Sequence, residues 1–217
     1  MNTRRKETKN KIFREKLIAV IRLRSIQNAE RMDKVVSAIL SGGISNIEIT
    51  LTTRDAIQWI QKISERDDCC VGAGTVMDTE MAHTAIRAGA RYLVSPIFFP
   101  EMITIAHEKE ACAFPSGLTP TELYTAWKAG ADAVKIFPLV NLGPAYLRAV
   151  QGPLPGIPLI PTNGVTTENA ADFFRAGAVA IGAGSTLVND ELVREKKFDE
   201  ITRRAKQFVE IVKNLGT

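Results

Sequence analysis

A short unit that recurs four times constrains the fold of this chain more than any other feature of its sequence. In each copy an amphipathic helical pattern ends at a glycine, and an apolar run rich in β-branched residues follows within a few positions. The four helix ends lie at 40–43, 87–90, 128–131 and 175–178. The apolar runs that follow them lie, in the same order, at 47–50, 92–95, 133–137 and 179–182. Glycine permits the left-handed backbone that ends a helix, and a continuous apolar run is typical of a buried parallel strand. The repeat therefore predicts helices that alternate with parallel strands.

Four further apolar runs lie between these copies and bring the number of predicted strands to eight. They lie at 17–21, 69–72, 112–115 and 158–161, each before a plausible helix. Eight strand-helix units predict an α/β fold of the (βα)8 TIM barrel type. An open doubly wound sheet is the competing prediction, but no run is long and edge-like, and the first glycine-rich turn lacks a dinucleotide fingerprint. We predict one domain over residues 1–217, in which residues 1–16 form an N-terminal extension with a short helix.

Composition limits the class of protein and its partners. The chain has 217 residues, of which 45% are hydrophobic and 24% charged, as in ordinary globular proteins. Its formal charge of +4 lies largely in two basic ends without an aromatic-rich stripe, so we expect no nucleic-acid partner. The apolar run at 17–21 is too short to cross a membrane, and we expect no membrane partner. Three cysteines without disulfide or metal-ligand spacing favour a reducing compartment, so we expect a cytoplasmic protein.

One lysine is predicted to point into the barrel. In the run at 133–137, the period-two alternation of a strand puts Lys135 on the same face as Ala133 and Phe137. An ammonium group is costly to bury, so the pKa of Lys135 should fall and its neutral amine should become available. A neutral lysine amine is a nucleophile for carbonyl groups.

A carboxylate is predicted to face this lysine across the barrel. Alternation across residues 46–52 turns Glu48 and Thr52 inward. The second and sixth strands lie opposite each other in an eight-stranded barrel, so Glu48 could serve as the proton shuttle for a ligand bound by Lys135. The alternative is a buried ion pair between Lys135 and Glu48 that only fills the interior.

Glycine-rich loops after the last two predicted strands indicate a phosphate site. The loop after the seventh strand contains Thr162, Asn163 and Gly164, and the loop after the eighth contains Gly184 and Ser185. In barrel enzymes, loops at these places commonly offer backbone N–H groups and a helix N-terminus to phosphate. The alternative is a pair of tight strand-to-helix turns.

Other strand ends complete the candidate site. Arg22, after the first run, is a candidate anchor for a carboxylate or a phosphate, with an exposed surface arginine as the alternative, and Thr75 after the third run offers a hydroxyl. His83 and His107 fall within predicted helices, so we expect them to have surface or packing roles. Because no histidine, cysteine and carboxylate cluster has metal-ligand spacing, we predict neither a metal nor another cofactor.

With these residues in place, the chain resembles the 2-keto-3-deoxy-6-phosphogluconate / 4-hydroxy-2-oxoglutarate (KDPG/KHG) aldolase family along nearly its whole length. The matching segments follow in unbroken order at 47–51, 72–76, 95–96, 118–122, 135–138, 161–165 and 182–185. The resemblance implies a homotrimeric, cofactor-free class I aldolase in which Lys135 forms a Schiff base and Glu48 accepts and donates the proton.

The resemblance also implies a substrate-binding set. Thr75 and Pro96 would line the substrate pocket, while Gly164, Gly184 and Ser185 would hold the phosphate.

The chain departs from the family pattern at three places. Many members carry a carboxylate-binding arginine at the position of Thr52, so Arg22 or Arg54 would have to bind this group here. Asn163 replaces the first glycine of a Gly-Gly pair in the phosphate loop. At 115–118 the glycine is displaced from the usual Pro-Gly pattern.

The predicted reaction is cleavage of phosphorylated KDPG to pyruvate and glyceraldehyde 3-phosphate through a Schiff base on Lys135. The alternative substrates are 4-hydroxy-2-oxoglutarate and the epimer 2-keto-3-deoxy-6-phosphogalactonate. A non-catalytic phosphate-binding barrel or a phosphosugar isomerase is the alternative of a different class, since a fold by itself carries no function.

Overall fold

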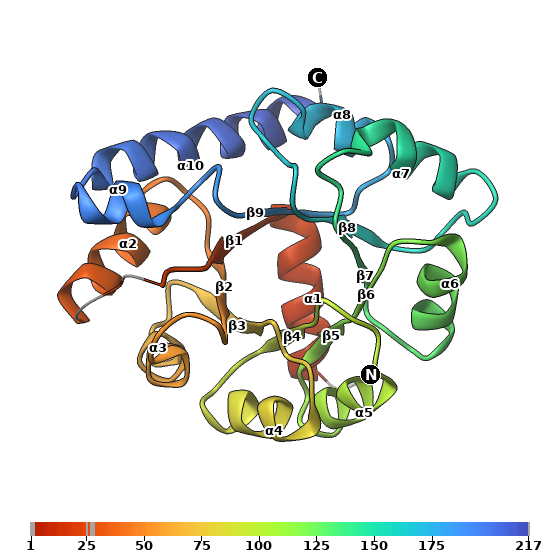
Figure 1. The fold of residues 1–217 in the computed structure, drawn as a ribbon, viewed down its shortest axis with the longest axis horizontal. Coiled ribbons are helices and arrows are strands. Elements are labelled where there is room, and N and C mark those ends of the chain that lie inside the picture. The colour runs from red at the N-terminus through yellow and green to blue at the C-terminus, as the bar shows by residue number, and fades with distance from the viewer. Residues whose placement is uncertain (1–2, 25, 27–28, 217) are drawn as a thin grey trace.

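A computed structural model describes residues 3–24, 26 and 29–216 of the chain. Helices surround a curled arrangement of parallel strands (Figure 1). The strands are β1 (Leu17–Ile21), β2 (Asn46–Thr50), β3 (Cys70–Gly74), β4 (Tyr92–Val94), β5 (Cys112–Phe114), β6 (Ser116–Gly117), β7 (Val134–Ile136), β8 (Leu159–Pro161) and β9 (Ile181–Ala183). The helices are α1 (Thr3–Glu15), α2 (Ala29–Ser41), α3 (Ala56–Ser64), α4 (Thr79–Arg87), α5 (Pro100–Glu108), α6 (Pro120–Lys128), α7 (Gly143–Gln151), α8 (Ala170–Arg175), α9 (Asp190–Arg194) and α10 (Phe198–Lys213), followed by the 3-10 turn η1 (Asn214–Gly216).

The paired strands run parallel and form two sheets. The first sheet has the order β5-β4-β3-β2-β1-β9, and the second has the order β6-β7-β8. One extended segment passes from the first sheet to the second and is interrupted at Pro115, which lacks the N–H group that a ladder needs. Isolated parallel bridges join Leu159 to Ala178 and Thr162 to Gly182. The predicted α/β architecture with a parallel, curled sheet is confirmed.

The recurring helix-glycine unit is confirmed in detail. Gly43, Gly89, Gly130 and Gly177 follow α2, α4, α6 and α8, and their φ angles are 94°, 97°, 98° and 103°. These are left-handed conformations, which glycine adopts without the steric cost that a Cβ would bring. Each of the eight predicted apolar runs overlaps a strand.

The strands separate two apolar clusters. Alternate residues such as Ile47, Ile49, Val134 and Ile136 pack outward against the helices. The inner cluster contains residues from the opposite strand faces and one residue of the N-terminal helix: Ile12, Ile18, Val20, Cys70, Tyr92, Val94, Cys112, Phe114, Ala133, Ile160 and Ala180. The inward phase predicted for the strand of Lys135 is thus confirmed by its neighbour Ala133.

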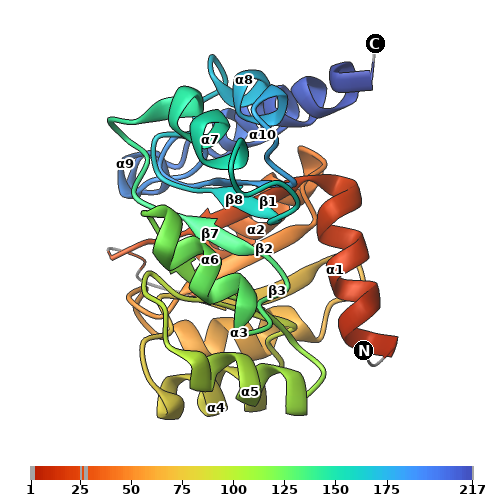
Figure 2. The same cartoon turned by 90° about the vertical axis from the view of Figure 1, so that its right-hand side faces the viewer.

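Helix α1 covers the inner cluster at the end where the strands begin. Figure 2 shows the helix at one end of the strands, and its Ile12 is fully buried in the inner cluster. The Arg5 guanidinium donates to both carboxylate oxygens of Asp132, at 2.9 and 3.0 Å. The strand ends on the opposite side therefore remain as the place for a site. In the part of the chain that the structure describes, no helix combines the length and the apolar character needed to cross a membrane.

The strand predicted to reach Thr52 ends two residues earlier. β2 stops at Thr50, and Thr52 lies in the turn that follows, exposed, with its Oγ1 3.1 Å from that of Thr50. The prediction that the strand reaches Thr52 was therefore wrong, and a role for Thr52 in binding the substrate stays a prediction. The buried hydroxyl in this turn belongs to Thr53, which accepts a hydrogen bond from Leu23 N at 3.2 Å.

Candidate active site

Lys135 lies in the middle of β7 and lines a cavity on the inner side of the curled strands. The residue is only 4% exposed, and its Nζ lies 4.7 Å from the centroid of the Phe137 ring. Burial lowers the pKa of Lys135 because the ammonium loses its hydration. The negative charge of Glu48 opposes this shift, and the positive charge of Arg22 adds to it. Burial therefore shifts Lys135 toward the neutral amine, which is the nucleophilic form.

Glu48 occupies the middle of β2 and is 3% exposed. Burial raises the pKa of Glu48, although the positive charges of Lys135 and Arg22 oppose the shift. A Cβ on Gly74 of β3 would collide with the Glu48 carboxylate, so the glycine provides the space that this side chain occupies. A raised pKa makes the protonated form of a carboxyl group more accessible, which suits a group that must both donate and accept a proton.

Lys135 and Glu48 sense each other's charge without forming a direct ion pair. Each appears among the causes of the other's pKa shift, yet no nitrogen-oxygen distance of 4.0 Å or less joins them in the described residues. A pair that only filled the interior would need direct contact to offset the loss of hydration. The arrangement therefore favours the reading in which both groups act on a ligand.

Two adjoining cavities connect these residues to the glycine-rich loops. The inner one is lined by Ile18, Glu48, Val94, Phe114, Lys135, Ile160, Thr162 and Gly182. The outer one, of about 240 Å³, is lined by Val20, Arg22, Phe137, residues 162–165, Gly182, residues 184–186 and residues 188–190. Thr162 and Gly182 belong to both cavities. A ligand seated on the loops can therefore extend toward Lys135.

The loop after β8 takes the shape expected of a Gly-Gly pair. Asn163 has a φ of 67° and Gly164 a φ of 95°, and asparagine is one of the few residues that tolerate the left-handed region. A Cβ on Gly164 would lie 2.7 Å from the Cα of Val140, so only glycine fits there. Asn169, which the sequence analysis missed, holds the loop by donating to Gly164 O at 2.8 Å. The replacement of glycine by Asn163 therefore preserves the turn.

Backbone donors line the outer cavity. The amides of Gly164, Val165, Gly184 and Ser185 donate to no protein acceptor among the described residues. Amides without partners at the carboxyl ends of parallel strands are suited to an anionic group such as phosphate. The loop residues from which the sequence predicts a phosphate site therefore line one cavity, and their binding of phosphate stays a prediction.

Arg22, although exposed, lies close enough to Glu48 and Lys135 to affect both. It lines the outer cavity, and its charge acts on both Glu48 and Lys135. Arg54 has a side chain that is 71% exposed and points to Asp55, with 3.6 Å between Nε and Oδ2. Of the two candidates that could replace the arginine missing at Thr52, the geometry selects Arg22.

Thr75 and Pro96 lie at the same rim, but neither lines the two cavities just described. Thr75 follows β3 with a φ of 59°, and Pro96 lies just beyond β4; both are half-buried. A left-handed conformation is a true outlier for a β-branched residue, and such outliers gather at functional sites. The strain at Thr75 is the local signal that supports a role for this residue.

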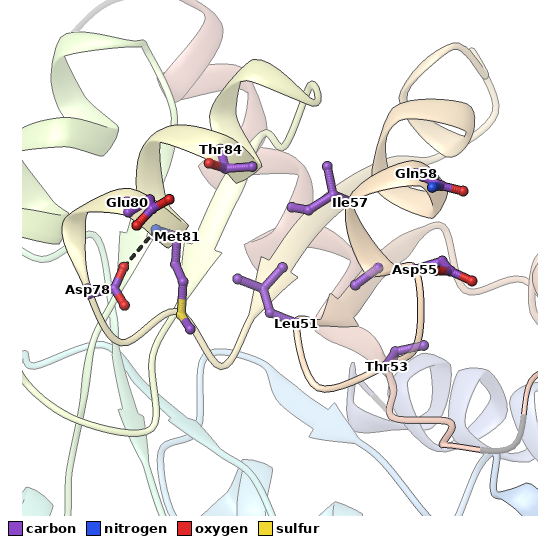
Figure 3. Close-up of a pocket in the computed structure, with 10 residues that line it drawn as sticks. Leu51, Thr53, Asp55, Ile57, Gln58, Asp78, Glu80, Met81 and Thr84 are labelled. Atoms are coloured by element: carbon purple, nitrogen blue, oxygen red, sulfur yellow. Dashed lines mark hydrogen bonds between the residues drawn. The ribbon is translucent and has the colours of Figure 1, made fainter.

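A larger pocket, of about 480 Å³, lies away from this pair between α3 and α4 (Figure 3). Leu51 and Met81 contribute apolar side chains, and Asp55, Asp78 and Glu80 contribute acidic ones. Asp78 caps α4 by accepting from Met81 N at 2.7 Å. Its described lining includes no lysine, cysteine or histidine, so the smaller cavities at Lys135 remain the candidate active site.

The cysteines and histidines lie outside this site. Burial raises the pKa of the Cys70 thiol to about 11 and that of Cys112 still further, so neither thiol is activated as a nucleophile. His83 and His107 lie in α4 and α5, as predicted, and His107 Nε2 contacts Asp132 Oδ2 at 3.1 Å.

Comparison with known proteins agrees with this geometry. The family model described as KDPG and KHG aldolase matches residues 8–204. The chain is 32% identical over 178 residues to the 2-dehydro-3-deoxy-phosphogluconate aldolase of Pseudomonas aeruginosa, covering 81% of each protein. It is 35% identical over 181 residues to the 2-dehydro-3-deoxy-6-phosphogalactonate aldolase of Escherichia coli strain K12, covering 81% of this chain and 86% of that protein.

One solved structure is similar to this chain over most of the length of both chains. The KDPG aldolase of Legionella pneumophila, with pyruvate captured as a covalent carbinolamine intermediate, matches with a TM-score of 0.80 and 25% identity, covering 91% of this chain and 96% of that chain. The fold, the buried lysine and these relatives together define an aldolase, a carbon-carbon lyase. The chain belongs to the KDPG and KHG aldolase family. The family resemblance read from the sequence is confirmed.

Proposed function

We propose that this enzyme cleaves KDPG to pyruvate and glyceraldehyde 3-phosphate through a Schiff base on Lys135. The observation that carries the proposal is the burial of Lys135 beside Glu48, in a cavity that adjoins the glycine-rich loops. The covalent pyruvate adduct in the Legionella pneumophila relative supports the same chemistry.

The cycle begins with the neutral amine of Lys135 and a protonated Glu48, the forms that burial favours. The amine adds to the C2 ketone and gives a carbinolamine. Glu48 protonates the departing hydroxyl, water leaves, and an iminium ion forms. The iminium is itself an electron sink, so the step requires no metal.

Glu48, now a carboxylate, takes the proton of the C4 hydroxyl as the C3–C4 bond breaks. The aldehyde leaves, and the bonding electrons pass into the iminium to form an enamine. Glu48 returns the proton to C3, which gives the pyruvate imine. Hydrolysis of the imine releases pyruvate, regenerates the Lys135 amine and returns a proton to Glu48.

The substrate phosphate would bind at the outer cavity. The unpartnered amides of Gly164 and Ser185 offer hydrogen bonds, and Arg22 offers a positive charge within the same cavity. Thr162, shared by both cavities, would contact the part of the substrate between the phosphate and C2. We assign Thr75, Pro96, Asn163 and Gly184 to the same binding surface, as the family pattern implies.

A second candidate substrate is the galactonate epimer, 2-keto-3-deoxy-6-phosphogalactonate. It is favoured by the identity of 35% to the Escherichia coli enzyme named for that substrate. Comparing kcat/KM for both epimers and for 4-hydroxy-2-oxoglutarate tests the assignment. Preference for KDPG supports the proposal, whereas preference for either other acid reassigns the substrate without changing the reaction class.

We also propose that the chain is a single domain in which the eight strand segments act as one closed (βα)8 barrel. The continuity of β5 with β6 and the bridges between the β8 and β9 segments support closure.

We propose further that the enzyme is a cytoplasmic homotrimer. Exposed large apolar side chains near the carboxyl ends of the strands, suited to subunit contact, are Met77, Ile97, Tyr124, Val140 and Leu142. Sedimentation equilibrium tests the trimer.

Borohydride reduction in the presence of pyruvate tests the reaction class. A class I aldolase should gain the mass of a reduced pyruvate adduct, because borohydride fixes the imine. A phosphate-binding barrel or a phosphosugar isomerase should gain none. Absence of the adduct in folded protein would overturn the proposal.

A further inference from the structure

Ser116 carries a buried hydroxyl without a hydrogen-bond partner. The residue is 2% exposed, and its Oγ is buried and has no partner in the described residues. The nearby hydroxyl of Ser95, also buried, is satisfied by accepting from Ile97 N at 3.1 Å. A buried hydroxyl that loses water without gaining a partner destabilises the folded state, so its retention calls for a reason.

Strand register places this hydroxyl beside the nucleophile. β6 pairs with β7 so that Ser116 is opposite Lys135, and Lys135 N donates to Pro115 O at 2.9 Å. Paired residues of adjacent parallel strands project to the same face of the sheet, and neighbouring strands lie about 4.8 Å apart. Ser116 and Lys135 are thus neighbours on one face.

That face is the interior of the barrel. Gly117, the next residue, faces outward, because a Cβ there would lie 2.7 Å from the Cβ of Glu122 on α6. Alternation then turns Ser116 inward, as it does Phe114 in the same extended segment. The displaced glycine in residues 115–118 is therefore the change that puts a hydroxyl next to Lys135.

We propose that Ser116 binds the substrate by donating a hydrogen bond to the oxygen on C2 while Lys135 adds to that carbon. The C2 oxygen lies one bond from the atom that Lys135 attacks, so a donor on the neighbouring strand is positioned to reach it. The hydroxyl gives up no proton, because Glu48 supplies the proton with which this oxygen leaves as water. The inference rests on the proposed Schiff-base chemistry and adds a substrate-binding group to it.

Ser116→Ala tests the role, and Tyr92→Phe is the matched control. Tyr92 also carries a fully buried hydroxyl without a partner in the described residues, but it lies on β4, which is not paired with the strand of Lys135, and its ring packs against Gly72 and Phe114. Each substitution removes one orphan hydroxyl, so both variants should unfold at urea concentrations no lower than wild type. The readouts are the rate of borohydride trapping with pyruvate and kcat/KM for cleavage.

We expect Ser116→Ala to lower both rates about 10-fold, as for the loss of one hydrogen bond, while Tyr92→Phe stays within about twofold of wild type. Ser116→Cys, which keeps a side chain of similar shape with a weaker donor, should lie between Ser116→Ala and wild type. If wild type traps pyruvate and Ser116→Ala traps it equally fast, Ser116 has no role in the reaction. If wild-type protein fails to trap pyruvate, the proposed function fails and this inference fails with it.

Discussion

A buried carboxyl group near the amino ends of the strands and another toward their carboxyl ends have opposite pKa shifts, because their hydrogen-bond partners differ. At the amino end, Asp132 accepts from Arg5, from Ala113 N at 3.0 Å and from His107, and burial alone would raise its pKa, yet these hydrogen bonds hold it below the ordinary value. Toward the carboxyl end, Glu48 is equally buried but has no hydrogen bond or ion pair in the described residues, and its pKa is raised. The first arrangement stabilises the fold, whereas the second leaves a charge-bearing group available for chemistry.

Among the substitutions that test this comparison, the largest effect on activity is expected at Lys135. Lys135→Ala should lower kcat/KM by about 10⁴-fold or more and abolish trapping of pyruvate, because no other amine occupies the site. Lys128→Ala, at an exposed lysine of α6, is the control and should keep wild-type rates. Steady-state cleavage assays measure both variants. Activity in Lys135→Ala near that of the control would remove Lys135 from the mechanism.

Glu48→Gln should have the next largest effect. Glutamine preserves the shape of the side chain but cannot carry the proton of the C4 hydroxyl, so cleavage should fall about 10²- to 10⁴-fold. Trapping of pyruvate should persist at a lower rate, because Lys135 remains. Comparing the two rates in one preparation separates proton transfer from imine formation. Near wild-type cleavage would show that another group moves the proton.

Asp132→Ala should instead affect stability. Removing the carboxylate leaves the Arg5 charge unpaired at the amino end of the strands, and breaking a buried pair typically costs about 3–5 kcal/mol of unfolding free energy. Urea unfolding measures this loss, and kcat of the folded variant should stay within about twofold of wild type. A large fall in kcat without loss of stability would contradict the separation of the two ends.

The Asp132 carboxylate should also control how the free energy of unfolding changes at acid pH. Because the pKa of Asp132 in the folded state lies below its ordinary 3.8, its contribution is fully present above pH 3.8 and is lost as pH falls through the folded value. Asp132→Asn should therefore flatten the pH dependence of unfolding free energy in that range. An unchanged slope would indicate that other carboxylates control acid unfolding.

The smallest expected effect is at Arg22. Arg22→Ala should raise KM for KDPG about 10-fold with a smaller change in kcat, because the arginine lines the outer cavity. Arg54→Ala, whose side chain is exposed and points to Asp55, should leave KM unchanged. Equal effects of the two substitutions would contradict the assignment of Arg22 to the substrate.

Local pattern predicts the parts of this site that lie on strands. Lys135 and Glu48 could be assigned because alternation in a short buried strand fixes which side chains turn inward. The predicted strand was two residues too long because a turn begins after Thr50, and the hydrophobic pattern does not show where a strand ends. The choice between Arg22 and Arg54 could not be made, since both follow strands in loops whose paths depend on tertiary packing.

Long-range contacts were beyond the sequence pattern. Arg5 and Asp132 are 127 positions apart, so no local spacing marks their pairing. The role of Asn169 depends on the folded path of the loop around Gly164. The missing partner of Ser116 could be recognised only once the neighbouring strands were in place, although the displaced glycine marked the segment.

Mapping the position of the trapped pyruvate tests the account most directly. Wild-type protein is reduced with borohydride in the presence of pyruvate, digested, and the modified peptide is sequenced by mass spectrometry. The account predicts a reduced pyruvate adduct on Lys135 and on no other lysine. An adduct on a different lysine, or none in folded protein, would contradict it.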